Sequence, residues 1–145
     1  MKAPPPGWPR MSASVFYDDP RAAIDWLCKA FGFEVRVLVE GDGGQIAHSQ
    51  LLLADALIMV AGTAGKEPWQ QTYRSPRGIG GGITQSLVFH VDDVDQHCAR
   101  AVAAGANLVR ELRTDDYGEE YWADRTYGAT DPEGHLWWFL QRMRG

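Results

Sequence analysis

The sequence predicts an α+β protein built from two tandem βαβββ modules. One observation is an internal repeat, in which Asp19 and Asp93 each stand between a short apolar segment and an amphipathic helical pattern. Another is that Gly32 and Gly105 follow these patterns at nearly the same interval, where glycine ends helices. Strand signals then follow each helix. Together they predict one curved mixed sheet, with the helices outside and a concave cavity inside.

The first module is expected to span residues 10–61. Asp19 can cap the helix with its carboxylate, and Pro20 suits the first helical position, where no backbone N–H is needed. The four residues of the loop at 41–44 are glycine-rich, which indicates a hairpin. The helix is expected at residues 20–31 and the strands at residues 11–17, 34–40, 45–53 and 56–60.

A linker at residues 62–83 separates this module from a second one at residues 84–143. The linker is rich in glycine and proline and has no sustained period, although a short helical turn around Trp69 and Tyr73 fits its composition. Connections of this length often shape a binding site. Strands are expected at residues 86–91 and 107–112, with a helix between them, followed by a strand, a turn and a strand over residues 122–141.

The last turn is the most strongly specified one in the chain. In Asp131-Pro-Glu-Gly134 the proline presets φ, the glycine accepts a positive φ, and the aspartate can bond its own backbone. The strand after it is apolar on both faces, because Trp138 belongs to one alternating set of apolar residues and Phe139 to the other. One face therefore meets a helix, and the other meets either more core or a ligand.

Composition excludes several classes of function. The net charge is −5 and the 14 Lys and Arg residues form no basic run, so we expect no nucleic-acid partner. Neither a signal-peptide core nor a membrane-length apolar run occurs, which predicts a soluble, cytoplasmic protein without a membrane partner. Cys28 and Cys98 match no zinc or redox spacing and are expected to be reduced core thiols.

At this point the sequence resembles the vicinal oxygen chelate superfamily, which comprises glyoxalases, extradiol dioxygenases and bleomycin-type resistance proteins. The resemblance covers about residues 11–142 and is closest to a metal-poor bacterial branch. It implies the paired-module fold and a homodimer with pockets near the subunit interface. The segments that carry it are Tyr17-Asp-Asp-Pro20, Ala30-Phe-Gly-Phe33, Val91-Asp-Asp-Val-Asp95, Ala104-Gly-Ala106, Asp124-Arg-Thr-Tyr-Gly128 and Asp131-Pro-Glu-Gly-His-Leu-Trp137.

The resemblance also implies a metal position, which this sequence does not support. Enzymes of the superfamily hold a divalent metal with His, Gln or Glu from the first and fourth strands of each module. The matching positions here are Ser12, Met59, Ser86 and Trp138. None of these side chains is a suitable ligand for a hard or borderline divalent ion, since indole has no lone pair to give and a thioether suits soft metals. We therefore expect no metal and no other cofactor.

Eight residues are candidates for contacting a ligand, and each has a structural alternative. Trp138 and Met59 either line a pocket or fill a closed core. His90 either binds a ligand or bonds to backbone at the end of its strand. His48 and Gln50 are contacts only if their strand face is the concave one, and a metal shared by His48 and His90 lacks a third ligand. The set is Phe16, His48, Gln50, Met59, Ser86, His90, Trp122 and Trp138.

Two further histidines are expected to be structural, with His97 on an exposed helix face and His135 bonded to backbone at the turn. Acidic pairs in the loop before the last strands, such as Asp115 and Asp116, are either solvated or attractive to a cation. The favoured function is therefore metal-independent binding or sequestration of a small, flat molecule that could be cationic. The alternative is a lyase, isomerase or dioxygenase-like enzyme with an atypical site, and a purely protein-binding role is a third possibility.

Overall fold

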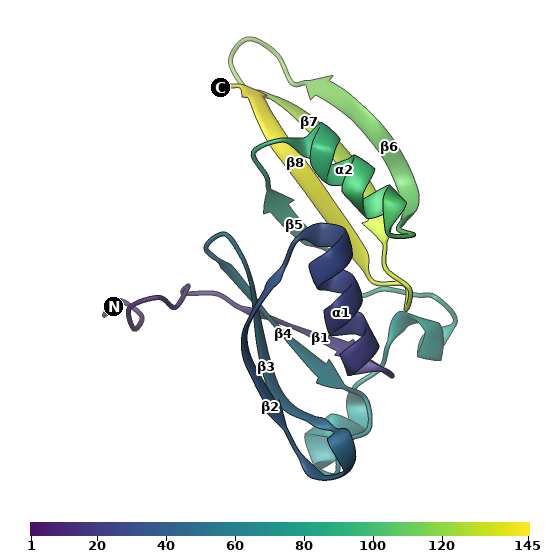
Figure 1. Ribbon diagram of the computed structural model, residues 1–145. Coiled ribbons are helices and arrows are strands. Elements are labelled where there is room, and N and C mark those ends of the chain that lie inside the picture. Colours follow the sequence, from purple (N-terminus) through teal and green to yellow (C-terminus); the bar gives the residue numbers. More distant parts are fainter.

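The computed structural model describes all 145 residues and contains two α-helices and two four-stranded sheets (Figure 1). The first module comprises β1 (Ala13–Tyr17), α1 (Pro20–Phe31), β2 (Glu34–Glu40), β3 (Ile46–Leu53) and β4 (Ala56–Gly62). The second comprises β5 (Leu87–His90), α2 (Val94–Ala103), β6 (Asn107–Asp116), β7 (Ala123–Thr130) and β8 (Leu136–Arg144). The predicted tandem βαβββ architecture is therefore confirmed.

The two sheets have the same topology. Their strand orders are β1-β4-β3-β2 and β5-β8-β7-β6, and in each the first strand pairs in parallel with the fourth while the other pairs are antiparallel. The prediction of one continuous sheet was wrong, because no strand pairing joins the modules. The modules are held together by side chains instead, which sequence periodicity does not reveal.

Both helices begin as the sequence predicts. The Asp19 carboxylate accepts from the Ala22 N–H, and the Asp93 carboxylate accepts from the Gln96 N–H, each at 3.0 Å. Gly32 ends α1 in the left-handed conformation, with φ of 79°, which glycine adopts without a Cβ clash. Neither helix has the length and apolar composition that crossing a bilayer requires.

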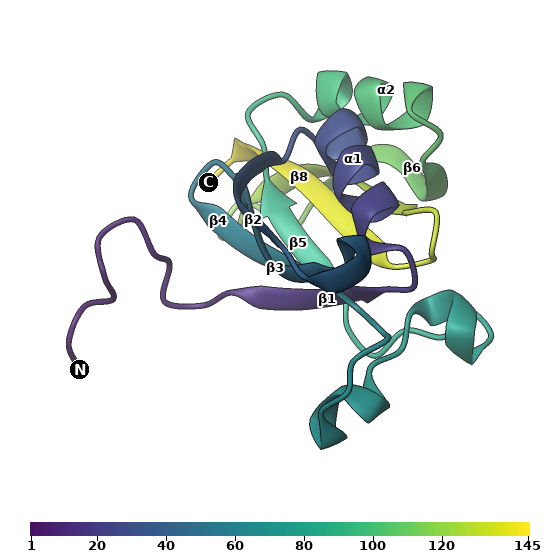
Figure 2. The ribbon, with the colours of Figure 1, turned by 60° about the horizontal axis from the view of Figure 1, so that its bottom comes forward.

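The helices lie side by side over the two sheets, and the opposite sheet faces carry no layer of secondary structure (Figure 2). The segment between the modules projects away from the helices. It contains two short 3₁₀ turns, Pro68–Thr72 and Pro76–Ile79, where the sequence predicted one. The strand β6 continues to Asp116, well past its predicted end. Two register shifts in its pairing with β7 accommodate its greater length.

The turn that closes the second module is also the main connection to the first. Asp131 is 5% exposed, and one of its oxygens accepts from the Tyr17 hydroxyl at 2.6 Å and from the Trp137 indole N–H at 3.0 Å. Its other oxygen accepts from the backbone N–H groups of Glu133 and His135. The carboxylate thus satisfies four donors from both modules, and this burial beside carboxylates raises the pKa of Tyr17.

Glu133 extends this connection to the start of α1. Its carboxylate accepts from the backbone N–H groups of Asp18 and Asp19 at 2.8 and 3.0 Å, and the Arg77 guanidinium lies 3.5 Å away. His135, as expected, bonds to backbone, at 2.6 Å from the Phe16 carbonyl oxygen. The turn of the second module therefore supplies acceptors to N–H groups that the first helix leaves free.

A second connection runs between the helices. His97 is not on an exposed face as predicted, because its ring is partly buried between α2 and the end of α1. One ring nitrogen lies 2.8 Å from the Phe31 carbonyl oxygen and the other 2.7 Å from the Tyr127 hydroxyl. A backbone carbonyl can only accept, so the nitrogen facing Phe31 carries the proton. Burial lowers the pKa of His97, and nearby Arg100 lowers it further.

Replacing Asp131 with alanine should destabilise the fold by about 3 kcal/mol or more, since buried donors on Tyr17 and Trp137 would lose their acceptor. Urea unfolding followed by circular dichroism measures this. The matched control is Asp55→Ala in the exposed turn between β3 and β4, which should change the free energy of unfolding by less than about 0.5 kcal/mol. Similar losses in both variants would contradict the assigned role.

Protonation of His97 should weaken the protein. Because the folded-state pKa is lowered, the unfolded chain binds more protons in the window between the two pKa values, and the free energy of unfolding must rise with pH there. The contribution is fully present above the ordinary histidine pKa of about 6.5 and is lost as pH falls from there through the lowered value. Urea titrations across this range should show a smaller pH dependence in His97→Gln, and equal dependence in both proteins would disprove it.

Candidate functional site

The sheet faces opposite the helices carry most of the predicted site residues. In the second sheet, strand alternation sends Tyr127 and Phe139 toward the helices and Trp138 the other way. Register then defines a row across all four strands on this open face. The row runs Val88, Trp138, Gly128, Arg110, with each residue the cross-strand partner of the next.

Gly128 gives the Trp138 ring its position. A Cβ built on Gly128 would lie 2.5 Å from the indole Cζ3 atom and 2.8 Å from Cη2, closer than real Cβ contacts allow. The six-membered ring therefore lies across β7, pointing from β8 toward β6. Any side chain at position 128 would displace it. The indole thus forms a flat, partly exposed surface over β7, the strand that pairs with β6 and Arg110.

Positive charge predominates on this face. Arg110 and Arg113 both bond to Asp115, the latter at 2.9 Å, while Arg142 bonds to Asp124 at 2.5 Å. The hydrogen bond from Arg110 lowers the pKa of Asp115 below its ordinary value. Three guanidinium groups thus face two carboxylates. In addition, the Nε–H of Arg110 is buried without any hydrogen-bond partner.

The carboxylates Asp115 and Asp116, which the sequence left as either solvated or attractive to a cation, are therefore paired with arginine. Asp115 is shared by two arginines, and Asp116 accepts from Arg144 at 2.5 Å and from the Gly118 N–H at 2.9 Å. The only unpaired acidic side chains in that loop are Glu119 and Glu120, and both are exposed to solvent. A positively charged ligand has little to pair with here.

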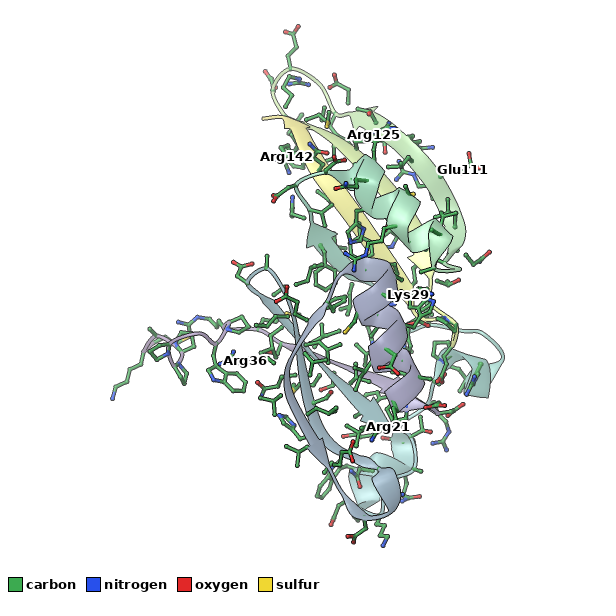
Figure 3. The ribbon with its side chains drawn as sticks, viewed as in Figure 1. Arg21, Lys29, Arg36, Glu111, Arg125 and Arg142 are labelled. Carbon is green, nitrogen blue, oxygen red and sulfur yellow. The ribbon has the colours of Figure 1, made fainter.

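Trp122 lies at the far end of the same sheet. The Arg142 guanidinium sits 5.2 Å from its ring centroid, and the rings of Tyr117 and Tyr121 lie about 6 Å away. Arg142 and Arg125 are both visible at this end of the sheet, with Arg125 bonding to Asp95 on the helix side (Figure 3). Trp122 is thus packed in a surface aromatic cluster, away from the middle of the row.

In the first sheet, the open face begins at Phe16. Its ring stacks on Tyr73 from the linker, with centroids 3.9 Å apart and planes 23° apart. The two rings line a cavity of about 400 Å³, together with Arg74, whose guanidinium bonds only to backbone carbonyls, and His135. Tyr73 is therefore packed within its own chain.

His48 and Gln50 lie on this open face, which answers the question that the sequence left undecided. Leu52 pairs with Leu57, so alternation places Gln50 and His48 on the same side of the sheet as Met59. Gln50 is 5% exposed and its side-chain nitrogen lies 2.9 Å from the His48 ring, while its carbonyl oxygen has no partner. Exchanging the two amide atoms would only move the unpaired group, because one partner cannot serve both.

The remaining candidates lie at the edges. Ser86 is exposed and precedes β5, and His90 ends that strand with an exposed side chain. His90 lines a cavity of about 560 Å³ at the junction of the modules, together with Leu53 and His97. No contact brings the first-sheet and second-sheet candidates together within one chain, and none of the four main cavities is lined by Met59 or Trp138.

The donors available do not fit the superfamily's metal. No group of three or more His, Cys, Asp or Glu side chains is arranged to hold an ion. At the positions implied by the resemblance the chain offers hydroxyls, a thioether and an indole, whose chemistry does not suit a divalent metal.

Sequence reasoning missed Gly128, Arg110 and Tyr73. Gly128 had a usable signal, since glycine inside a strand often marks a close approach by another group. Arg110 had none, because the register shift in β6 decides which of its charged residues face outward. The stacking of Tyr73 depends on the path of an irregular segment.

Comparison with known proteins places the chain in a family. A model of the Glyoxalase/Bleomycin resistance protein/Dioxygenase superfamily matches residues 11–139, and the protein therefore belongs to that superfamily. The superfamily that the sequence resembles is thereby confirmed.

Individual relatives are consistent with this assignment. The crystal structure of TioX from Micromonospora sp. ML1 is 32% identical, with a TM-score of 0.69 over 92% of this chain and 95% of that one. An uncharacterized protein of Mycobacterium tuberculosis (strain ATCC 25618 / H37Rv) is 29% identical over 136 residues, which are 94% of this chain and 76% of that protein. The fosfomycin resistance protein FosX of Listeria monocytogenes, 16% identical with a TM-score of 0.60 over 90% of each chain, shares the fold.

Proposed function

We propose that this protein binds and sequesters a small, flat molecule on its open sheet faces without using a metal. The observation that carries the proposal is the Trp138 indole, laid flat across Gly128 at the position where superfamily enzymes are expected to hold a metal ligand. A flat, partly exposed ring suits stacking against another flat ring. The surrounding apolar side chains, such as Leu136 and Leu140, supply the walls that small-molecule sites need.

Polar groups for orienting the ligand are present on both faces. In the first sheet, Gln50 has an unpaired polar atom beside His48, and in the second sheet Arg110 has an unpaired Nε–H. Unpaired buried groups carry a free-energy cost that a bound ligand would remove. This is the arrangement expected of a site that gains hydrogen bonds when it is filled.

A second copy of the chain would enclose these faces. They have no covering layer, and apolar side chains such as Val88 are 58% exposed on them. Trp69 is likewise 61% exposed on the linker. A homodimer would shield these groups and place residues from both sheets around one ligand.

Sedimentation at micromolar concentration should show a dimer, and a monomer under these conditions would contradict this part of the proposal.

Binding should be visible in tryptophan fluorescence. Titration with a panel of planar compounds should quench or shift the emission of the native protein, and Trp138→Ala should remove this response because the stacking surface is lost. The control is Trp69→Ala, which removes an indole from the linker and should leave the response in place.

The enzyme alternative would be favoured over binding and sequestration by two results together. The first is that no compound changes the tryptophan emission. The second is that the native protein turns over an oxo-acid or a glutathione adduct and His90→Ala does not.

The purified protein should contain no stoichiometric Zn, Ni, Mn or Fe. Serine hydroxyls, a thioether and an indole compete poorly with water and chelators for these ions. Elemental analysis after dialysis against a weak chelator tests this. About one metal per chain would contradict metal independence, and His48→Ala and His90→Ala would then show whether these histidines hold it.

A further inference from the structure

The row Val88, Trp138, Gly128, Arg110 provides more than a flat surface, because an arginine follows the indole on the next strand of the row. The ring spans Gly128, which is itself the cross-strand partner of Arg110. Neighbouring strands are about 4.8 Å apart, so the Arg110 backbone lies about one strand spacing beyond the ring's far end. From there the Arg110 side chain runs along β6 to Asp115, so a molecule that stacks on Trp138 and extends over β6 toward Asp115 would meet the guanidinium.

The charge at this edge is not neutralised within the chain. Asp115 serves Arg110 and Arg113 together, so the three groups retain an excess of one positive charge. The Arg110 side chain is 25% exposed and donates only one hydrogen bond, to Asp115, while its Nε–H has no acceptor. Arginine presents its donors in a planar fork that matches a carboxylate.

We propose that the ligand is a planar aromatic carboxylate, whose ring stacks on Trp138 and whose carboxylate is received by Arg110. This rests on the proposed binding function and names its ligand class. The cationic alternative weighed from the sequence has no support on this face, since both of its carboxylates, Asp115 and Asp124, are paired with arginine. An aromatic cation that paired with either carboxylate would displace an arginine and leave its guanidinium group unpaired.

The test compares three probes of the same ring. Naphthoate, its neutral carboxamide and the corresponding naphthylmethylammonium ion are titrated into the full-length protein by calorimetry. Naphthoate should bind about tenfold more tightly than the carboxamide, and the ammonium ion should bind most weakly. Raising the salt concentration should narrow this difference.

Variants separate the charge from the stacking surface. Arg110→Gln should remove the preference for naphthoate over the carboxamide, whereas Arg110→Lys should keep part of it because the charge remains. Arg113→Gln, which removes the excess positive charge but keeps the Arg110 fork, should reduce the preference less than Arg110→Gln does. Gly128→Ala should weaken all three probes alike by displacing the indole, with Gly78→Ala, where an added Cβ meets open space, as its control.

A gain-of-function variant guards against misfolding of the others. Asp115→Asn removes the carboxylate that competes for Arg110 and should tighten naphthoate binding about threefold or more, with little change for the carboxamide. A loosened or unchanged naphthoate affinity in this variant would count against the assignment of Arg110.

The outcomes distinguish this inference from the function beneath it. Equal binding of all three probes, lost in Trp138→Ala, would leave the binding function standing and overturn the carboxylate ligand. Tightest binding of the ammonium ion would do the same. If none of the three probes binds, this inference is overturned, and the proposed function falls with it only if the panel of planar compounds also leaves the fluorescence unchanged.

Discussion

The structure depends on one buried carboxylate, that of Asp131. It accepts hydrogen bonds from Tyr17 of the first module, from Trp137 of the second and from two backbone N–H groups of its own turn. No strand pairing joins the two sheets, so side-chain contacts of this kind must fix their relative position. A buried carboxylate with four donors is satisfied only when all of them are in place, which makes the arrangement specific.

This connection also explains why the protein presents its sheets as it does. Glu133 holds the start of α1, and His97 links α2 to the end of α1, so both helices are committed to the same side. The opposite sheet faces are then left open to a ligand or to a second chain. The same contacts that join the modules therefore determine where a site can exist.

The open face of the second sheet combines a tryptophan with a facing glycine. A tryptophan occupies a position where superfamily enzymes are expected to place a metal ligand, and a glycine on the next strand makes room for its ring. Arginine and aspartate pairs lie farther along the same face, with arginine in excess. Together they support the proposed recognition by stacking and charge, within a fold that the chain shares with TioX and FosX.

The sequence alone determined the paired modules, the helix ends and the closing turn. These depend on local chemistry: Asp19 and Asp93 cap helices, Gly32 adopts a positive φ, and Asp131-Pro-Glu-Gly134 specifies a turn. Only the tertiary structure decided that there are two sheets, that His97 is partly buried and that Arg110 lies in the same cross-strand row as Trp138. These results depend on contacts between distant residues and on register shifts in β6, and neither leaves a periodic signal in the chain.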